Sequence, residues 1–189
     1  MSSEEEQGII EAVRNGNRDA FEALVHQYQK PIYNVVYRML RDREESWDVT
    51  QTVFLKSFEK IHQYDPGRKF FSWLCRIAIN ESIDRHSRRP PEVAAAELND
   101  ADAELASEGS TSDSEPDVEA QREELGKGLE AALMRLDNDH RSVVVLKHVG
   151  GMSYEDISAT LEVSEKTVKS RLYSARQKLR GRLKRDAYL

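Results

Sequence analysis

The chain has 189 residues, which is enough for one medium-sized domain or two small ones. Charged residues make up 33% of it and only 9 Gly and 5 Pro interrupt it, so the composition favours small helical units over a large α/β enzyme or a β-sandwich. The single cysteine, the lack of an apolar run of about 18 residues and the acidic first segment argue against disulfides, membrane spans and export, so we expect a cytoplasmic protein.

The net charge of −6 is the sum of three unlike blocks. Residues 1–91 have 14 Lys and Arg against 14 Asp and Glu, residues 92–124 have 1 against 12, and residues 125–189 have 13 against 8. The middle block also lacks aromatic residues, which is typical of a flexible linker. We therefore predict helical domains over residues 1–90 and 122–189, joined by an acidic linker over residues 91–121.

Two apolar stripes predict the first helices. Apolar residues recur at steps of three and four from Phe21 to Leu40, which predicts a pair of amphipathic helices with Pro31 as a kink or break. A second stripe with the same spacing comprises Trp47, Gln51, Phe54, Phe58 and Ile61. These five side chains are predicted to share one face of the next helix.

A turn at Tyr64-Asp65-Pro66-Gly67 precedes a further helix from about Phe70, for which two faces are predicted. The inward face comprises Phe71, Leu74, Cys75, Ala78 and Ile79, and the other face comprises Trp73, Arg76, Asn80 and Asp84. Aromatic rings and an amide beside cations are what single-stranded bases require, because rings stack on bases and amides bind base edges. A purely structural, core position for Trp73 remains an alternative.

The loop before this helix repeats the same chemistry, with Arg68 and Lys69 between the aromatic residues Tyr64 and Phe70. For each of these two cations, the alternative is a solvated surface position that binds no ligand. Cys75 lies on the apolar stripe, where a small buried hydrophobe is commoner than a nucleophile. No group of residues has the spacing of a metal site, so we expect no catalysis, no metal and no cofactor.

The last block predicts a helix-turn-helix. A helix is expected over residues 125–136 and another up to Gly150-Gly151, although the β-branched residues 143–145 leave a strand open. Ser153 and Asp156 form the pattern of a capping box that begins a short helix. After a turn, Ser164 precedes a long helix over residues 165–185.

The second helix of such a motif enters the major groove with its N-terminal residues near the bases. Its inward face is predicted at Val168, Leu172, Ala175 and Leu179. The residues expected to bind DNA are Ser164, Lys166, Thr167, Lys169, Ser170, Arg171, Ser174 and Arg176. A basic helix that faces only solvent remains the alternative.

Four segments in order resemble the bacterial RNA polymerase sigma factors of the short extracytoplasmic-function group. They are AFEALVHQYQKPIYNVVYRML, DVTQTVFLKSFEKI, FFSWLCRIAINESIDRHSRR and HRSVVVLKHVGGMSYEDISATLEVSEKTVKSRLYSARQKL. The resemblance implies that the first domain binds the clamp of core RNA polymerase and melts the minus-10 element of promoter DNA. It implies that the second domain recognises the minus-35 element, and that an anti-sigma protein controls the chain.

The resemblance also implies roles for single residues. Positions that match the clamp-binding helix are Asp48, Gln51 and Phe54, and Asn80 matches a position that faces the opened strand. The loop over residues 64–70 resembles a pocket for a flipped base. Positions that match minus-35 contacts are Lys169, Arg171 and Ser174. Thr52 departs from the family, which usually has a carboxylate there.

Two other classes of protein remain to be weighed. A response regulator with a C-terminal helix-turn-helix would need strands alternating with helices in its first domain, and residues 1–90 lack the short β-branched runs for a sheet. An enzyme that modifies nucleic acid would need a metal or nucleophile constellation or a P-loop, and none is present. A sigma factor is therefore the interpretation that we carry forward.

Overall fold

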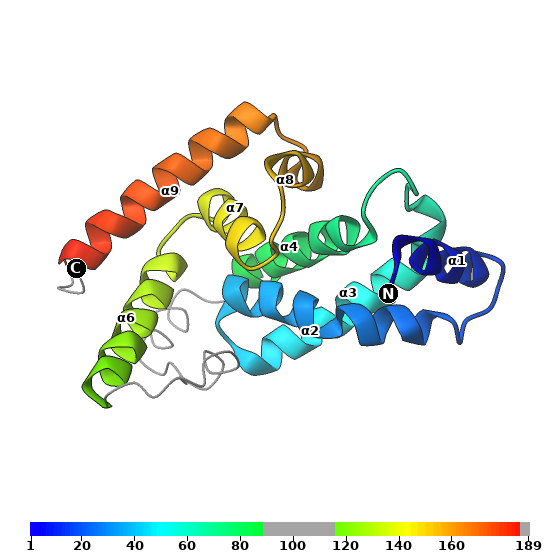
Figure 1. Ribbon diagram of the computed structural model, residues 1–189, viewed down its shortest axis with the longest axis horizontal. Helices are drawn as coiled ribbons and strands as arrows, with labels where there is room; N and C mark the ends of the chain where they lie inside the picture. Colours follow the sequence, from blue (N-terminus) through cyan, green and yellow to red (C-terminus); the bar gives the residue numbers. More distant parts are fainter. Residues whose placement is uncertain (89–115, 186–189) are drawn as a thin grey trace.

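The computed structural model describes residues 1–88 and 116–185, and all regular structure in these ranges is helical (Figure 1). The elements are α1 (Ser3–Arg14), α2 (Phe21–Leu40), α3 (Arg43–Glu59), the short 3-10 helix η1 (Ile61–Gln63), α4 (Phe70–Arg88), α6 (Pro116–Met134), α7 (Asn138–His148), α8 (Tyr154–Leu161) and α9 (Glu165–Arg185). This confirms the predicted all-α class. Residues 91–115 of the predicted linker lie outside the described residues, and its last part, 116–121, is the start of α6.

The first two helices differ from the prediction. The sequence did not indicate α1, which begins with a capping box between Ser2 and Glu5. The predicted helix pair over residues 21–40 is wrong, because α2 is one helix that continues through Pro31. The helix buries side chains on both sides of Pro31, including Leu24 and Ile32, and this packing outweighs the backbone hydrogen bond that proline cannot donate.

The predicted face of α3 is also wrong. Trp47 and Gln51 are exposed, whereas Phe54 and Ile61 are buried. The buried face of the helix comprises Ser46, Val49, Thr50, Val53, Phe54 and Ser57. Small hydroxyl residues belong to it because their side chains donate to carbonyls one turn back, as Thr50 does to Ser46 at 2.6 Å.

The two faces of α4 follow the prediction more closely. Leu74, Cys75, Ala78 and Ile79 are all buried, while Phe71 is half-buried. Burial raises the pKa of the Cys75 thiol, so the thiolate that a nucleophile requires is disfavoured. Cys75 is therefore a core residue, as expected.

Side-chain caps begin α7, α8 and α9, which belong to the second group of helices. The Asp137 carboxylate accepts from the backbone N–H of His140 at the start of α7, and the residues left open between helix and strand are helical. Ser153 and Asp156 form the predicted capping box of α8, and Ser164 accepts from the N–H of Thr167 at the start of α9. The predicted inward face of α9 is buried and also includes Leu183.

The two groups of helices pack against each other (Figure 1). α6 and α7 lie against α2, and α8 lies against α4. Buried side chains from both groups belong to one continuous core. Within the described residues, no helix is long and apolar enough to cross a membrane. The packing brings the short helix of the helix-turn-helix to the polar face of α4.

Candidate nucleic-acid and polymerase interface

The exposed side of α3 is the first candidate surface. Asp48 and Gln51, two of the positions that match the clamp-binding helix of the family, lie on it. The Thr52 hydroxyl donates to the backbone carbonyl of Asp48 at 2.9 Å. Phe54 does not lie on this surface, because its ring packs edge-on against Phe21 in the core. Leu55 is 66% exposed instead. The surface therefore combines polar groups with an apolar side chain, a composition that suits a protein partner.

The second candidate surface is formed by α4 and the loop before it. Arg68, Lys69, Asn80 and Asp84 are exposed, and Trp73 and Arg76 are half-buried. Tyr64 and Phe70 are buried, so their rings do not face a ligand in this arrangement. The sequence prediction thus included two residues that support the loop along with six that reach the surface.

Tyr64 holds the loop before α4 in place through contacts of its hydroxyl and its ring. Its hydroxyl donates to the carbonyl of Arg68 at 2.5 Å, and its ring lies edge-on to Phe70 with centroids 5.2 Å apart. Arg14 of α1 donates to the carbonyls of Ile61, at 3.1 Å, and of Tyr64. The loop that carries the exposed cations is therefore fixed by buried contacts that depend on α1, which sequence patterns did not reveal.

Trp73 belongs to both the core and the surface. Its ring lies 5.4 Å from that of Tyr64 and 5.5 Å from that of Phe70, yet it also lines a cavity of about 340 Å³. Lys69 and Arg76 line the same cavity. An aromatic ring that lines a cavity together with two cations is suited to a nucleotide, because the ring can stack on a base while the cations neutralise phosphates.

The third candidate surface is the outer face of α9. The exposed residues on it that the sequence predicted are Lys166, Lys169, Ser170 and Arg176, and the cap residue Ser164 is also exposed. Thr167 and Ser174 are half-buried. Tyr173 is 67% exposed and was missed, because an aromatic residue on a helix first suggests the core. Cations beside an exposed ring make this face suited to the grooves and phosphates of DNA.

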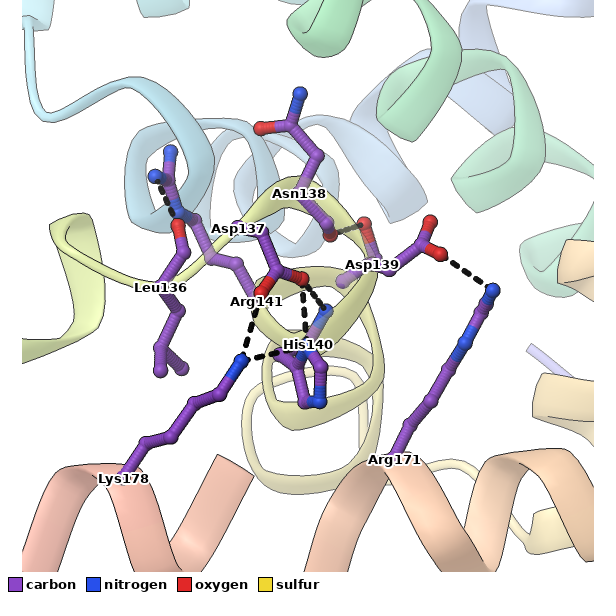
Figure 2. Close-up of polar contacts among 9 residues, drawn as sticks. Leu136, Asp137, Asn138, Asp139, His140, Arg141, Arg171 and Lys178 are labelled. Atoms are coloured by element: carbon purple, nitrogen blue, oxygen red, sulfur yellow. Dashed lines mark hydrogen bonds and ion pairs between the residues drawn. The ribbon is translucent and has the colours of Figure 1, made fainter. Parts of the chain in front are cut away.

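Arg171 lies on another side of α9, toward α7 (Figure 2). Its guanidinium pairs with the Asp139 carboxylate, and two turns later Lys178 donates to Asp137 at 2.9 Å. Partial burial acts to raise the pKa of Asp137, but hydrogen bonds from Lys178 and His140 outweigh it and hold this pKa below its ordinary range. These two cations therefore fasten α9 to α7 in this arrangement.

Arg141 anchors the turn before α7 from inside (Figure 2). It is 2% exposed, and its guanidinium donates to the carbonyls of Met134 at 2.6 Å and Met39 at 2.9 Å. It also donates to the carbonyl of Leu136 at 2.8 Å, the contact that Figure 2 shows. Carbonyls at the end of a helix have no partner within that helix, so the guanidinium supplies the donors that the end of α6 lacks. Across the ranges 1–88 and 116–185, no cluster of His, Cys, Asp and Glu is arranged to hold a metal.

Both groups of helices match models of known protein families. The family model "Sigma-70 region 2" matches residues 24–90, and "Sigma-70, region 4" matches residues 127–179. The chain is 33% identical over 181 residues to the ECF RNA polymerase sigma factor SigW of Bacillus subtilis, covering 93% of this chain and 95% of that protein. This chain belongs to the extracytoplasmic-function sigma factors. The RNA polymerase sigma-H factor of Pseudomonas aeruginosa is 31% identical, covering 94% and 93% of the two chains.

Solved structures similar to this sigma factor share its fold. CnrH, solved in complex with the cytosolic domain of CnrY, has a TM-score of 0.70 at 26% identity and covers 96% of this chain and 99% of its own. A sigma factor RpoE from Bartonella quintana, solved with the anti-sigma factor NepR, has a TM-score of 0.65 at 22% identity, with coverage of 87% and 96%.

Membership of the family decides between the classes of protein weighed from the sequence. The sigma factor binds core RNA polymerase and directs promoter recognition and transcription initiation, and it is not an enzyme. The response regulator and the nucleic-acid-modifying enzyme are therefore excluded. Family membership does not by itself assign roles to single residues, which depend on the geometry described above.

Proposed function

We propose that this sigma factor divides its work between two domains, residues 1–90 and 122–189, with residues 91–121 joining them. In the first domain, α3 binds the polymerase clamp, and α4 with the loop before it binds the opened minus-10 strand. In the second, the exposed face of α9 binds the minus-35 element. The observation that carries the proposal is that α3, α4 and α9 each carry polar side chains in a grouping of different chemistry.

Clamp binding is assigned to Asp48 and Gln51, which are exposed on one side of α3, with Leu55 beside them. Asp48→Lys combined with Gln51→Ala should weaken binding to core polymerase and leave the helical content unchanged. Glu11→Lys makes a similar charge change at an exposed position on α1 and serves as the control. Unaltered assembly of the double variant, measured by fluorescence anisotropy with labelled core polymerase, would remove this assignment.

Strand opening is assigned to Asn80, Trp73 and the cations Arg68, Lys69 and Arg76, with the exposed carboxylate of Asp84 at the end of the same face. A flipped base loses stacking and pairing worth a few kcal/mol, which a ring and an amide can replace. Asn80→Ala should reduce permanganate-detectable melting while assembly with polymerase stays intact. A template mismatched across the minus-10 region should restore activity, and Ser87→Ala, an exposed change later on α4, should have no effect.

Tyr64 and Phe70 have a supporting role in this proposal, because both rings are buried beneath the loop. Their replacement should loosen the loop rather than remove a base contact. Tyr64→Phe deletes the hydroxyl that donates to the Arg68 carbonyl and keeps the ring. Reduced melting by this variant, with promoter sequence preference unchanged, is the expected result; an altered base preference would indicate direct contact.

Minus-35 recognition is assigned to the exposed face of α9, where Lys166, Lys169, Ser170 and Arg176 lie together, flanked by Ser164, Thr167 and Ser174. Lys169→Ala should weaken promoter binding. If Lys169 contacts phosphate, all sequences lose affinity alike and the salt slope falls by about one; if it contacts a base, the loss concentrates on one position and amounts to about 1 to 3 kcal/mol. Equal affinity of variant and parent on every sequence would remove Lys169 from the interface.

Arg171 differs from these residues, because its guanidinium is paired with Asp139 rather than free on the outer face. It can bind DNA only if this pair breaks. Arg171→Ala and Asp139→Ala distinguish the two roles: if the pair positions α9, both changes weaken promoter binding, and if Arg171 binds DNA, only its own removal does. Binding of each variant holoenzyme to promoter DNA is the measurement.

Control by an anti-sigma protein and action in the cytoplasm complete the proposal. CnrH and the Bartonella sigma factor are each solved with a partner protein, and the second partner is an anti-sigma factor. A sigma factor must also meet polymerase and DNA, which supports a cytoplasmic location. Affinity purification of the tagged chain from its own host should recover core polymerase and one small additional protein; recovery of polymerase alone under all conditions would contradict the anti-sigma part.

A further inference from the structure

The N-terminal helix α1 packs against α2 and η1 (Figure 1). Gln7 and Arg14 are seven positions apart on it, which is about two helical turns, so both side chains lie on one face. Gln7 donates to the hydroxyl of Tyr64 at 3.4 Å, and Arg14 donates to the backbone carbonyl of the same residue. One helix therefore holds Tyr64 both at the end of its side chain and at its backbone.

Arg14 binds two carbonyls of the chain that joins α3 to α4. Its Nε donates to the carbonyl of Ile61 at 3.1 Å, and a second guanidinium nitrogen donates to the carbonyl of Tyr64. The guanidinium carbon also lies 5.8 Å from the centre of the Tyr64 ring. Arginine holds its donors in a fixed planar fork, whereas lysine offers one flexible ammonium. The geometry at this position therefore favours arginine.

The contacts of Tyr64 continue into the loop over residues 64–69. Its hydroxyl donates to the carbonyl of Arg68 at 2.5 Å. Between these two residues, the Asp65 carbonyl accepts from the N–H of Arg68 at 3.0 Å, and the Asp65 carboxylate accepts from the N–H of Gly67 at 2.9 Å. The loop is thus a small hydrogen-bonded unit that is joined to α1 through Tyr64. A shift of Tyr64 is therefore expected to move the loop cations Arg68 and Lys69.

Arg14 itself is not placed to bind DNA. It is half-buried and its donors face the carbonyls of Ile61 and Tyr64, whereas Arg68 and Lys69 are exposed. The helices α2, α3 and α4 pack closely on one another, so the core of this part of the chain does not depend on Arg14. Loss of its contacts should loosen the loop and leave these helices folded.

We propose that Arg14 is a positioning residue for strand opening, which holds the loop over residues 64–69 in the shape that binds the opened minus-10 strand. It acts through Tyr64 and does not contact DNA. The inference rests on the proposed assignment of α4 and this loop to the minus-10 strand. A loop that adopts the binding shape for only a fraction of the time binds with an affinity reduced by that fraction. Loss of hydrogen bonds from a charged donor should lower this fraction by about tenfold.

The kinetics of promoter opening by the holoenzyme test this role. The variant Arg14→Ala in the full chain should leave assembly with core polymerase and affinity for closed promoter duplex unchanged. It should slow permanganate-detectable opening by about tenfold. A template mismatched across the minus-10 region should restore most of the activity, because the opening cost is then removed. Arg18→Ala removes the same charge from an exposed position after α1 and, as the matched control, should open promoters as the parent does.

Combined variants test whether Arg14 acts through Tyr64. Arg14→Ala and Tyr64→Phe loosen the same loop, so the double variant should open promoters about as slowly as the slower single variant. Arg14→Ala combined with Lys169→Ala should instead lose promoter use by the product of the two separate losses, because Lys169 lies on α9 and shares no partner with Arg14. Arg14→Lys should recover part of the opening rate, since an ammonium can donate to one of the two carbonyls.

The outcomes separate the inference from the proposed function. If Arg14→Ala opens promoters at the parent's rate while Asn80→Ala slows opening, the inference is overturned and the assignment of α4 stands. If neither change slows opening, the assignment of α4 fails and the inference fails with it. A loss of core assembly as large as the loss of opening, or losses that multiply in the double variant with Tyr64→Phe, would also overturn the inference. Should Arg14→Ala fail to fold, Arg14→Lys takes its place, and opening at the parent's rate then overturns it.

Discussion

Replacement of the buried Arg141 by methionine tests how the turn between α6 and α7 is held to its neighbours. Methionine keeps much of the length of the side chain but has no donor. The change leaves three carbonyls without the guanidinium that binds them, those of Met134, Leu136 and Met39. A buried acceptor without a donor costs about 1 to 3 kcal/mol, and burial of the apolar side chain returns about 2 kcal/mol. We expect a net loss of roughly 4 kcal/mol.

The loss is measured by thermal unfolding of the full chain, followed by circular dichroism. For a protein of this size, about 1 kcal/mol corresponds to about 2 to 4 °C in Tm, so the unfolding transition of the chain should fall by about 10 °C. Arg141→Lys keeps the charge but offers a single ammonium, and its Tm should lie between those of the parent and Arg141→Met. Arg135→Met, at an exposed neighbouring position, should change Tm little. Equal shifts for the Arg135 and Arg141 variants would refute the reasoning.

Three further predictions concern charge, core and cap. Asp137→Asn keeps a capping side chain but removes the partner of Lys178, so at neutral pH it should cost about 1 kcal/mol, discounted for solvent exposure. Because the folded-state pKa of Asp137 is depressed, its contribution is present above the unfolded value of about 4 and lost as pH falls through the folded value, so the two proteins should converge in acid urea titrations. Phe70→Ala empties a fully buried site and should cost about 3 to 5 kcal/mol in urea unfolding. Ser153→Ala removes the α8 cap and should cost about 1 kcal/mol in the same assay.

Each of these predictions has an outcome that contradicts it. A difference between Asp137→Asn and the parent that persists unchanged in strong acid would show that the ion pair is not its source. A loss below about 1 kcal/mol for Phe70→Ala would mean that the loop and Tyr64 collapse into the space. Full stability of the Ser153→Ala variant would mean that Asp156 alone satisfies the start of α8.

Local patterns predicted the elements whose signals lie within a few residues. Ser153 and Asp156 identified the start of α8, and the apolar steps of α9 identified its buried face, because capping and helical periodicity are local. The face of α3 was predicted wrongly for the opposite reason. Ser46, Thr50 and Ser57 look like surface residues, but they are buried against neighbouring helices. The ring of Trp47 packs against that of Tyr33 and stays 43% exposed.

Some residues of the candidate site could be predicted from local patterns, and others depend on contacts between distant helices. Asn80, Lys69 and Arg76 were found from the sequence, because an exposed polar face opposite an apolar stripe can be recognised within one helix. The burial of Tyr64 depends on α1, a helix more than 40 residues earlier in the chain. No local pattern contains that information.

The sequence by itself determined the helical class, the helix-turn-helix and the family, because periodicity, caps and ordered motifs are properties of short segments. Only the tertiary structure decided which cations are available to DNA. Arg171 forms an ion pair with Asp139, and Lys178 forms one with Asp137. Lys69 donates to Asp156, which lies 87 residues later in the chain. Such pairs arise from the packing of helices that are distant in the chain, so a count of charges along the sequence cannot reveal them.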